Sequence, residues 1–222
     1  MKKLMIALCL VALAASGASA DILWDQSNWD TSGDGFVNMA WTSCNMISGN
    51  TKVHQANDVT FASDVVISSI TIYETEGNGN AFSATQGYLW IAPKTGSLPT
   101  VGSDVVNNAA NLVNISSAYV EKDGVFGVAI TASGLNLALP AGSYWVSLTP
   151  RCSAGFWPWS VLCFSSDGIL GDSTKFIEAC AVNSNWGDLF APDTHDGAFK
   201  VEGSVVVGTE NESWGGIKAL YR

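Results

Sequence analysis

The stretch from Val65 to Tyr73, VVISSITIY, decides the fold of this chain. Successive side chains of an extended strand point to opposite faces, so apolar residues fall on both sides of this one. One face is expected to carry Val66, Ser68, Ile70 and Ile72, and the other Ile67, Ser69, Thr71 and Tyr73. Partial apolar cover on both faces is typical of a strand inside a two-layered β structure.

Similar stretches lie further out along the chain. Residues 88–92, 125–131 and 144–149 are apolar on both faces in the same way, and residues 199–207 alternate apolar with polar side chains as a half-buried strand does. Good turn formers lie between them, because Gly accepts positive φ and Pro presets its own: Asn78-Gly79, Asp123-Gly124 and Pro140-Ala141-Gly142. Hairpins and antiparallel pairing follow. Apolar residues in 105–113 recur at helical spacing after Ser103, so a short helix and two irregular strands both fit there.

Composition agrees with an all-β domain. Charged residues make up 14% of the chain, Gly numbers 22, and Val, Ile, Thr, Ser and Trp are abundant, which favours strands and tight turns over helices. The length suits one domain with a proper core. We therefore expect a single antiparallel β-sandwich of jelly-roll type over residues 21–207.

The first twenty residues have the features of a secretory signal. Lys2 and Lys3 form a basic start, an apolar stretch runs over residues 4–15, and Ala18-Ser19-Ala20 is a small-residue cleavage site, so the mature chain is expected to begin at Asp21. The apolar stretch is shorter than the ~20 residues that cross a bilayer, so no membrane span is expected in the mature chain. This predicts a secreted or cell-surface protein.

The mature chain is strongly acidic. Removal of Lys2 and Lys3 leaves eight basic against twenty acidic residues, a net charge of −12. Nucleic acid needs clustered Lys and Arg, which are scattered here, and an anionic membrane would repel this charge. Acidity of this kind favours solubility and identifies no ligand.

Four cysteines follow the signal, and an even number in an exported protein predicts two disulfides. Of the three connectivities, we favour Cys152 with Cys163 and Cys44 with Cys180, because the first pair flanks a hairpin-like segment at residues 153–160. A metal site is disfavoured, since no C-x-x-C spacing or neighbouring His supports it.

Several short segments form an ordered series that carries a family resemblance. They are Asp21–Gln26 (DILWDQ), Gln55–Phe61 (QANDVTF), Ile67–Tyr73 (ISSITIY), Gly142–Leu148 (GSYWVSL) and Asp196–Gly203 (DGAFKVEG). The series resembles secreted bacterial β-sandwich domains that open with an L-Y/W-D-Q strand and carry an A-D-D-F segment, where this chain has N-D-V-T-F. The resemblance spans residues 21–204 and implies the fold, but no particular chemistry.

The last segment, residues 208–222, combines a polar linker with the tail SWGGIKALYR. The tail resembles the W-G-x-I-K-x-L-Y-R ending of many exported bacterial proteins. Ser213 can cap a short helix that gathers four candidate docking residues, Trp214, Ile217, Leu220 and Tyr221. A helix this short needs a partner surface, either the sorting machinery or its own domain.

Catalytic motifs are absent from the sequence: there is no G-x-S-x-G, H-E-x-x-H or G-x-x-x-x-G-K. His195 and its neighbouring Asp residues are framed by Pro192 and Gly197, which is typical of an exposed turn. A glycan hydrolase would need two facing carboxylates, and Glu74, Glu76, Glu178 and Glu202 are available for such a pair.

One segment could hold a structural Ca²⁺. Asp30, Ser32 and Asp34 place oxygen ligands at alternate positions, with Gly35 at the sixth, as in the first half of a calcium loop. The closing carboxylate is missing because Trp41 stands at the twelfth position. An Asx-rich turn without metal is therefore the favoured interpretation, and no other cofactor is indicated.

Aromatic residues supply the sharpest functional hypothesis. Trp157 and Trp159 in the segment FWPW, together with Trp186, could stack on sugar rings if they are exposed. The competing interpretation is that they fill the ends of the sandwich. The sequence thus favours a non-catalytic structural or adhesive protein that meets extracellular polysaccharide or another cell-surface component. A carbohydrate-binding module is the alternative, and a hydrolase comes last.

Overall fold

The computed structural model describes residues 20–32, 35–37, 39–41, 52–76, 83–99, 112–152, 160–179, 187–188 and 195–206. Every regular element in these ranges is a β-strand. The strands are β1 (Asp21–Gln26), β2 (Gly35–Val37), β3 (Met39–Trp41), β4 (Lys52–Phe61), β5 (Val65–Glu76), β6 (Gln86–Pro93), β7 (Leu112–Lys122), β8 (Val125–Leu139), β9 (Gly142–Cys152), β10 (Ser160–Cys163), β11 (Lys175–Ala179), β12 (Gly187–Asp188) and β13 (Phe199–Val205).

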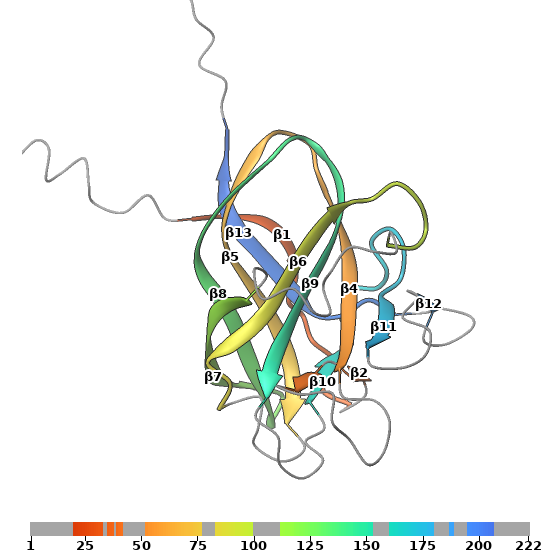
Figure 1. The fold of residues 1–222 in the computed structure, drawn as a ribbon. Helices are drawn as coiled ribbons and strands as arrows, with labels where there is room; N and C mark the ends of the chain where they lie inside the picture. Colours follow the sequence, from red (N-terminus) through yellow and green to blue (C-terminus); the bar gives the residue numbers. More distant parts are fainter. Residues whose placement is uncertain are drawn as a thin grey trace, which may run out of the picture.

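The described strands form one sheet that curls back on itself (Figure 1). One layer contains β1, β13, β5 and β8, and the other contains β6, β9, β4 and β11. Strand β7 joins them, because Leu112–Asn114 pair with β6 whereas Ile115–Lys122 pair with β8. Within the described strands, every pairing is antiparallel except that of β3 with β9. The expected all-β antiparallel sandwich is confirmed, and its two layers are continuous through β7.

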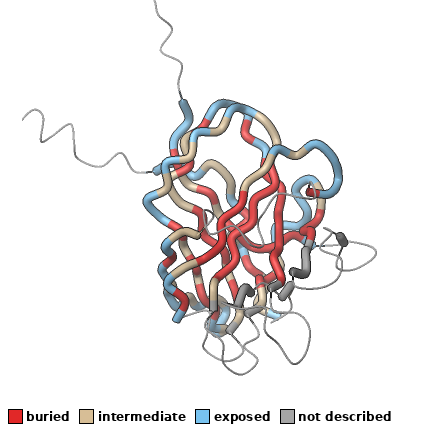
Figure 2. Tube along the Cα trace, viewed as in Figure 1, coloured by how far each residue is buried: buried red, intermediate tan, exposed pale blue. Residues whose placement is uncertain are grey.

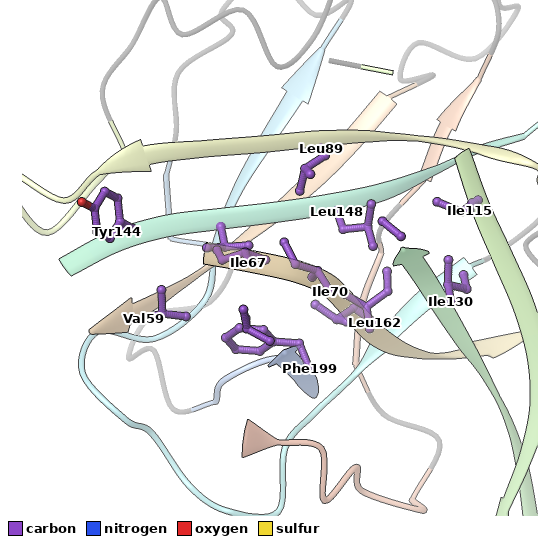
Figure 3. Packing of buried hydrophobic residues seen from close by; sticks show 14 of the residues in the cluster. Val59, Ile67, Ile70, Leu89, Ile115, Ile130, Tyr144, Leu148, Leu162 and Phe199 are labelled. Carbon is purple, nitrogen blue, oxygen red and sulfur yellow. The ribbon is translucent and has the colours of Figure 1, made fainter. Parts of the chain in front are cut away.

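The core lies between the two layers (Figures 2 and 3). Strands β5, β8 and β13 contribute Ile70, Ile130 and Phe199, which have 0%, 0% and 1% of their surface exposed. The facing layer contributes apolar residues of β4, β6 and β9, namely Val59, Leu89, Val146 and Leu148. Burial of these branched and aromatic side chains supplies most of the driving force for folding.

Strand β5 departs from the simple alternation in its sequence. Its pairing with β13 shifts register at this point, because the consecutive residues Glu202 and Gly203 pair with Ser69 and Ile67, which leaves Ser68 as an extra residue in β5. The shift brings Ile67 onto the same buried face as Ile70 and Ile72. The prediction that Ile67 lies on the face opposite Ile70 is therefore wrong, because the bulge reverses the phase of the alternation.

Strand β13 pairs across the extra residue of β5 and keeps its own alternation of buried and less buried residues up to Gly203. Phe199 and Val201 are buried, as the alternation predicts. Gly203 continues the buried row, whereas Val205, the last residue of the strand, is 45% exposed. The expected burial of Val205 is therefore wrong, because the buried row ends at Gly203, and Val207 lies outside the described residues.

The predicted turn between β7 and β8 is confirmed. Asp123 and Gly124 both have positive φ, 53° and 79°, as the two central residues of a tight type I′ hairpin turn require. The turn at Pro140-Ala141-Gly142 likewise connects β8 to β9. Asn78-Gly79 and most of residues 103–113 lie outside the described residues, but Leu112 and Val113 belong to β7.

Both chain ends leave the sheet on neighbouring strands. Asp21 at the start of β1 pairs with Gly203 of β13, and the amide of Val206 donates to the carbonyl of Asp64 beside the start of β5. The turn between β7 and β8 lies at the other end of β5, because Val128 of β8 pairs with Glu74. The termini and this hairpin are therefore at opposite ends of the domain (Figure 1).

Ile70→Ala should lower the free energy of unfolding by about 2–5 kcal/mol, because it leaves a cavity between the layers. Ile22→Ala is the matched control, since Ile22 is 58% exposed on the edge strand β1 and should change stability by less than about 0.5 kcal/mol. Urea unfolding followed by tryptophan fluorescence measures both. Equal effects of the two substitutions would contradict the assigned core.

Candidate functional site

Polar and aromatic side chains gather on the face of β4 and β9 that points away from the core. Alternation puts Val146 and Leu148 of β9 into the core, so Trp145, Ser147 and Thr149 point outward. The pairing register sets residues of the neighbouring strands beside them. We call this set the outer face: His54, Ala56 and Asp58 of β4, Tyr88 and Trp90 of β6, and Trp145, Ser147 and Thr149 of β9. All eight residues are buried.

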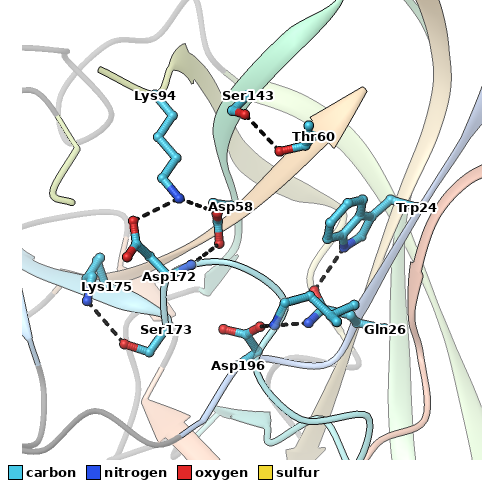
Figure 4. A network of polar contacts seen from close by, with 11 residues as sticks. Trp24, Gln26, Asp58, Thr60, Lys94, Ser143, Asp172, Ser173, Lys175 and Asp196 are labelled. Carbon is cyan, nitrogen blue, oxygen red and sulfur yellow. Dashed lines mark hydrogen bonds and ion pairs between the residues drawn. The ribbon is translucent and has the colours of Figure 1, made fainter. Parts of the chain in front are cut away.

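An ion-pair network borders the outer face (Figure 4). The ammonium of Lys94 contacts the carboxylate of Asp58, and it lies 2.8 Å from Oδ2 of Asp172 and 5.0 Å from the ring centre of Trp145. Burial lowers the pKa of Lys94, but hydrogen bonds to Asp172 and Asp58 and the charges of both carboxylates outweigh it, so the net shift is upward. Lys94 is therefore held as a cation that ties β6 to β4.

The loop between β10 and β11 is fastened to the same place. The amide of Asp172 donates to Oδ1 of Asp58 over 3.2 Å. Gly171 has φ +105°, and a Cβ built on it would stand 2.3 Å from Oδ2 of Asp58. Both the backbone conformation and the close approach to Asp58 therefore call for Gly at this position.

A second buried network surrounds Asp196 (Figure 4). Its Oδ2 accepts hydrogen bonds from Nε2 of Gln26 over 2.7 Å and from the amide of Leu170 over 2.8 Å. Its Oδ1 is buried and has no hydrogen-bond partner within the described part of the chain. Burial raises the pKa of Asp196, although the hydrogen bonds from Leu170 and Gln26 act in the opposite direction. The carboxyl thus joins β1, the β10–β11 loop and the segment before β13.

The two histidines occupy different environments. His54 is fully buried on the outer face, where its Nδ1 lies 3.0 Å from Oγ1 of Thr149 and its ring meets Tyr88 edge-on at 5.8 Å. His195 is exposed and stacks on Phe164 at 4.2 Å, while its carbonyl accepts from the amide of Thr174. Both rings are therefore in contact with neighbouring side chains.

The acidic residues considered for hydrolysis are also placed. Glu74 is fully buried on the core-facing side of β5, and Glu202 is paired with Lys200 at 2.9 Å. Ser69 also donates to Glu202 over 2.8 Å. The side chains of Glu76 and Glu178 lie outside the described residues.

The proposed calcium segment forms an Asx turn at its start. Oδ1 of Asp30 accepts the amide of Ser32 over 2.9 Å, and Asp34 lies outside the described residues. In the described part of the chain, no group of three or more His, Cys, Asp or Glu residues is arranged to hold a metal ion.

Cys163 differs from its predicted state. It is a free cysteine, buried in a cluster with Trp29 and Ala198 on the side of β10 away from the core. The predicted disulfide between Cys152 and Cys163 is therefore not formed in this structure, because the Cys163 side chain is enclosed by its own cluster. The side chain of Cys152 and all of Cys44 and Cys180 lie outside the described residues.

The other predicted site residues cannot be placed. Trp157, Trp159 and Trp186 lie outside the described residues, as do the tail residues Trp214, Ile217, Leu220 and Tyr221. Their roles in sugar binding and docking stay predictions.

The structure also reveals an exposed aromatic pair that the sequence analysis did not select. Tyr119 of β7 and Phe126 of β8 are 61% and 68% exposed. Both lie close to the Asp123-Gly124 turn. This turn is the one feature of the sequence that could have pointed to an exposed position for them. The sequence did not indicate that this end of the hairpin extends past the core.

Comparison of the chain with protein-family models, with curated proteins and with solved structures found no match. Among the described residues there is no helix of the length and apolar character needed to cross a membrane.

The thiol of Cys163 should resist alkylation in the native protein. Burial, reinforced by the charges of Glu74 and Asp30, raises its pKa to about 12, so very little reactive thiolate is present near neutral pH. Iodoacetamide should label Cys163 only after unfolding, without any reductant, as measured by peptide mass spectrometry. Labelling that required prior reduction would show a disulfide at Cys163 and contradict its free state.

Asp196→Asn should change how stability depends on pH. A raised folded-state pKa means that the folded protein holds the Asp196 proton more tightly than the unfolded chain does. The resulting stabilisation is present below pH 3.8, the ordinary value, and is lost as pH rises through the raised folded pKa. The variant lacks this loss, so its unfolding free energy relative to wild type should increase with pH across that window.

Urea unfolding over a series of pH values measures this difference. Asp21→Asn, which alters an exposed carboxyl, is the matched control. A difference between Asp196→Asn and wild type that fell as pH rose would contradict the upward shift.

Proposed function

We propose that this protein is a secreted, cell-surface β-sandwich protein that acts without catalysis as a structural or adhesive unit. The observation that carries the proposal is the position of exposed aromatic surface relative to the chain ends. Strands β1 and β13 leave the domain together at one end, and the hairpin with Tyr119 and Phe126 lies at the other. Exposed apolar side chains gathered in one place often mark a contact site.

This arrangement suits attachment at one end and contact at the other. The tail at residues 208–222 follows β13, so an anchor acting through the tail would hold the domain by the end that carries the termini. The β7–β8 hairpin would then point away from the surface. A rigid sandwich between an anchor and a contact site is a reasonable structural unit for adhesion.

The buried ionisable groups support a role without catalysis. Asp58, Lys94 and Asp172 are joined to one another, and Asp196 is held by Gln26 and the amide of Leu170. These contacts fasten the β10–β11 loop to the sheet. A general acid or base needs reach to a substrate, whereas Asp58, Lys94 and Asp172 are paired with one another and Asp196 is 1% exposed.

The protein should be retained by the surface of the cells that produce it. The full chain is expressed with its leader, and the product exported by the host is collected, incubated with washed cells and pelleted. We expect wild type in the pellet and at least a severalfold loss of retention for the double variant Tyr119→Ala/Phe126→Ala, which removes both exposed rings.

Ile22→Ala/Val205→Ala is the matched control, because it removes two exposed apolar side chains at the end where the termini lie. This control should bind like wild type. Failure of the host to export the chain, or equal retention of all three proteins, would overturn the proposal.

A further inference from the structure

Tyr119 and Phe126 lie next to each other on one face of the β7–β8 hairpin. Tyr119 pairs with Val128, and Phe126 is two residues from Val128 on the same strand, so both rings share its face. Val128 is 1% exposed and belongs to the core. Diagonal neighbours of this kind are about 7–8 Å apart at the backbone, within reach of aromatic side chains. The core-facing side of the sheet thus continues past the core as an aromatic platform, defined by Tyr119 and Phe126.

The opposite side of the hairpin is firmly held. Trp29 is 4% exposed and packs there against Gly127, whose missing side chain leaves room for the indole, since a Cβ would lie 3.4 Å from it. Nζ of Lys122 donates to Oδ1 of Asn28 and to the carbonyl of Trp29, both over 2.6 Å. The platform is therefore preorganised, which reduces the entropy lost when a ligand binds.

The side chains around the platform are polar and carry negative charge. Ser117 and Glu121 share the face of Tyr119, because positions two residues apart on a strand point the same way. Glu121 and the turn residue Asp123 are exposed. A ligand rich in hydroxyl donors suits these acceptors. An anionic ligand would be repelled, and so would a second copy of a mature chain whose net charge is −12.

The size of the platform favours a sugar chain over a protein. Stable protein interfaces bury about 800 Å² on each partner around an apolar centre. Among the described residues, the other exposed large apolar side chains lie off this hairpin, in β1, in loops and at the end of β13: Ile22, Leu98, Ile169, Leu170, Val205 and Val206. Two rings make a small apolar centre, but they match the apolar face of successive sugar rings.

We propose that Tyr119 and Phe126 bind a neutral polysaccharide by stacking on its sugar rings, with Ser117 and Glu121 hydrogen-bonding its hydroxyls. This inference rests on the proposed function, for which it names the class of ligand and the contact residues. The preorganised hairpin supplies the stacking surface, and the acidic border selects against anionic glycans.

Affinity electrophoresis of the full exported chain tests the inference. The probes are a soluble β-glucan, a mannan and a galactan as neutral polymers, and polygalacturonate as the acidic one. We expect retardation by at least one neutral polymer and none by polygalacturonate. Tyr119→Ala and Phe126→Ala should each weaken binding roughly tenfold, the size of one lost ring contact.

Three further variants separate stacking from folding. Phe126→Trp and Tyr119→Phe keep a ring at each position and should bind within about threefold of wild type, a difference below ~1 kcal/mol. Ile22→Ala/Val205→Ala should bind like wild type. Circular dichroism confirms that each protein is folded, and the ring-retaining variants keep the test decisive if an alanine variant does not fold.

Two results would overturn the inference. The first is no retardation by any neutral polymer, and the second is equal retardation of wild type and the alanine variants. If the chain is still retained by cells but protease treatment of those cells abolishes retention, the partner is a protein. In that case the ligand assignment fails while the proposed adhesive function stands.

Discussion

The structure depends on burial of two sheet faces against each other within a single curled sheet. Ile70, Ile130 and Phe199 from one layer meet Val146 and Leu148 from the other, and β7 passes from the first layer to the second without a break. Because the layers share this strand, neither can move away without disrupting the pairing of both. The bulge in β5 serves the same interaction, since it brings Ile67 onto the buried face that carries Ile70.

The buried polar groups follow from this arrangement. Strand β4 is covered on both faces, so its outward-facing residues His54 and Asp58 are removed from water as completely as its core residues. A buried charge is costly unless it is paired. Lys94 and Asp172 provide that pairing for Asp58, and in doing so they fasten the β10–β11 loop. The cluster of Asp58, Lys94 and Asp172 therefore attaches this loop to the sheet.

The β7–β8 hairpin at the other end of the domain leaves two aromatic side chains exposed to water. The row of side chains that includes the core residue Val128 ends in solvent at Tyr119 and Phe126, beside the turn between β7 and β8. Trp29 and Lys122 keep the hairpin in place from behind. Exposed rings on a supported hairpin differ from exposed rings on a loose loop, because the backbone that carries them is held in place before a ligand arrives. This difference underlies the proposed adhesion and polysaccharide binding.

The sequence by itself determined the strands that contain residues 65–73, 88–92, 125–131 and 144–149, the strand that begins at Phe199, the antiparallel class and the Asp123-Gly124 turn, because these depend on period-two alternation and on the φ preferences of single residues. It did not determine the phase reversal at Ile67, since a bulge is a property of paired strands. Nor could it show that Asp196 is held by Gln26, 170 positions away, or that Cys163 is a free thiol enclosed by Trp29 and Ala198. Tyr119 and Phe126 have the same alternation as core residues, and only the relative lengths and register of the assembled strands decide that they meet water.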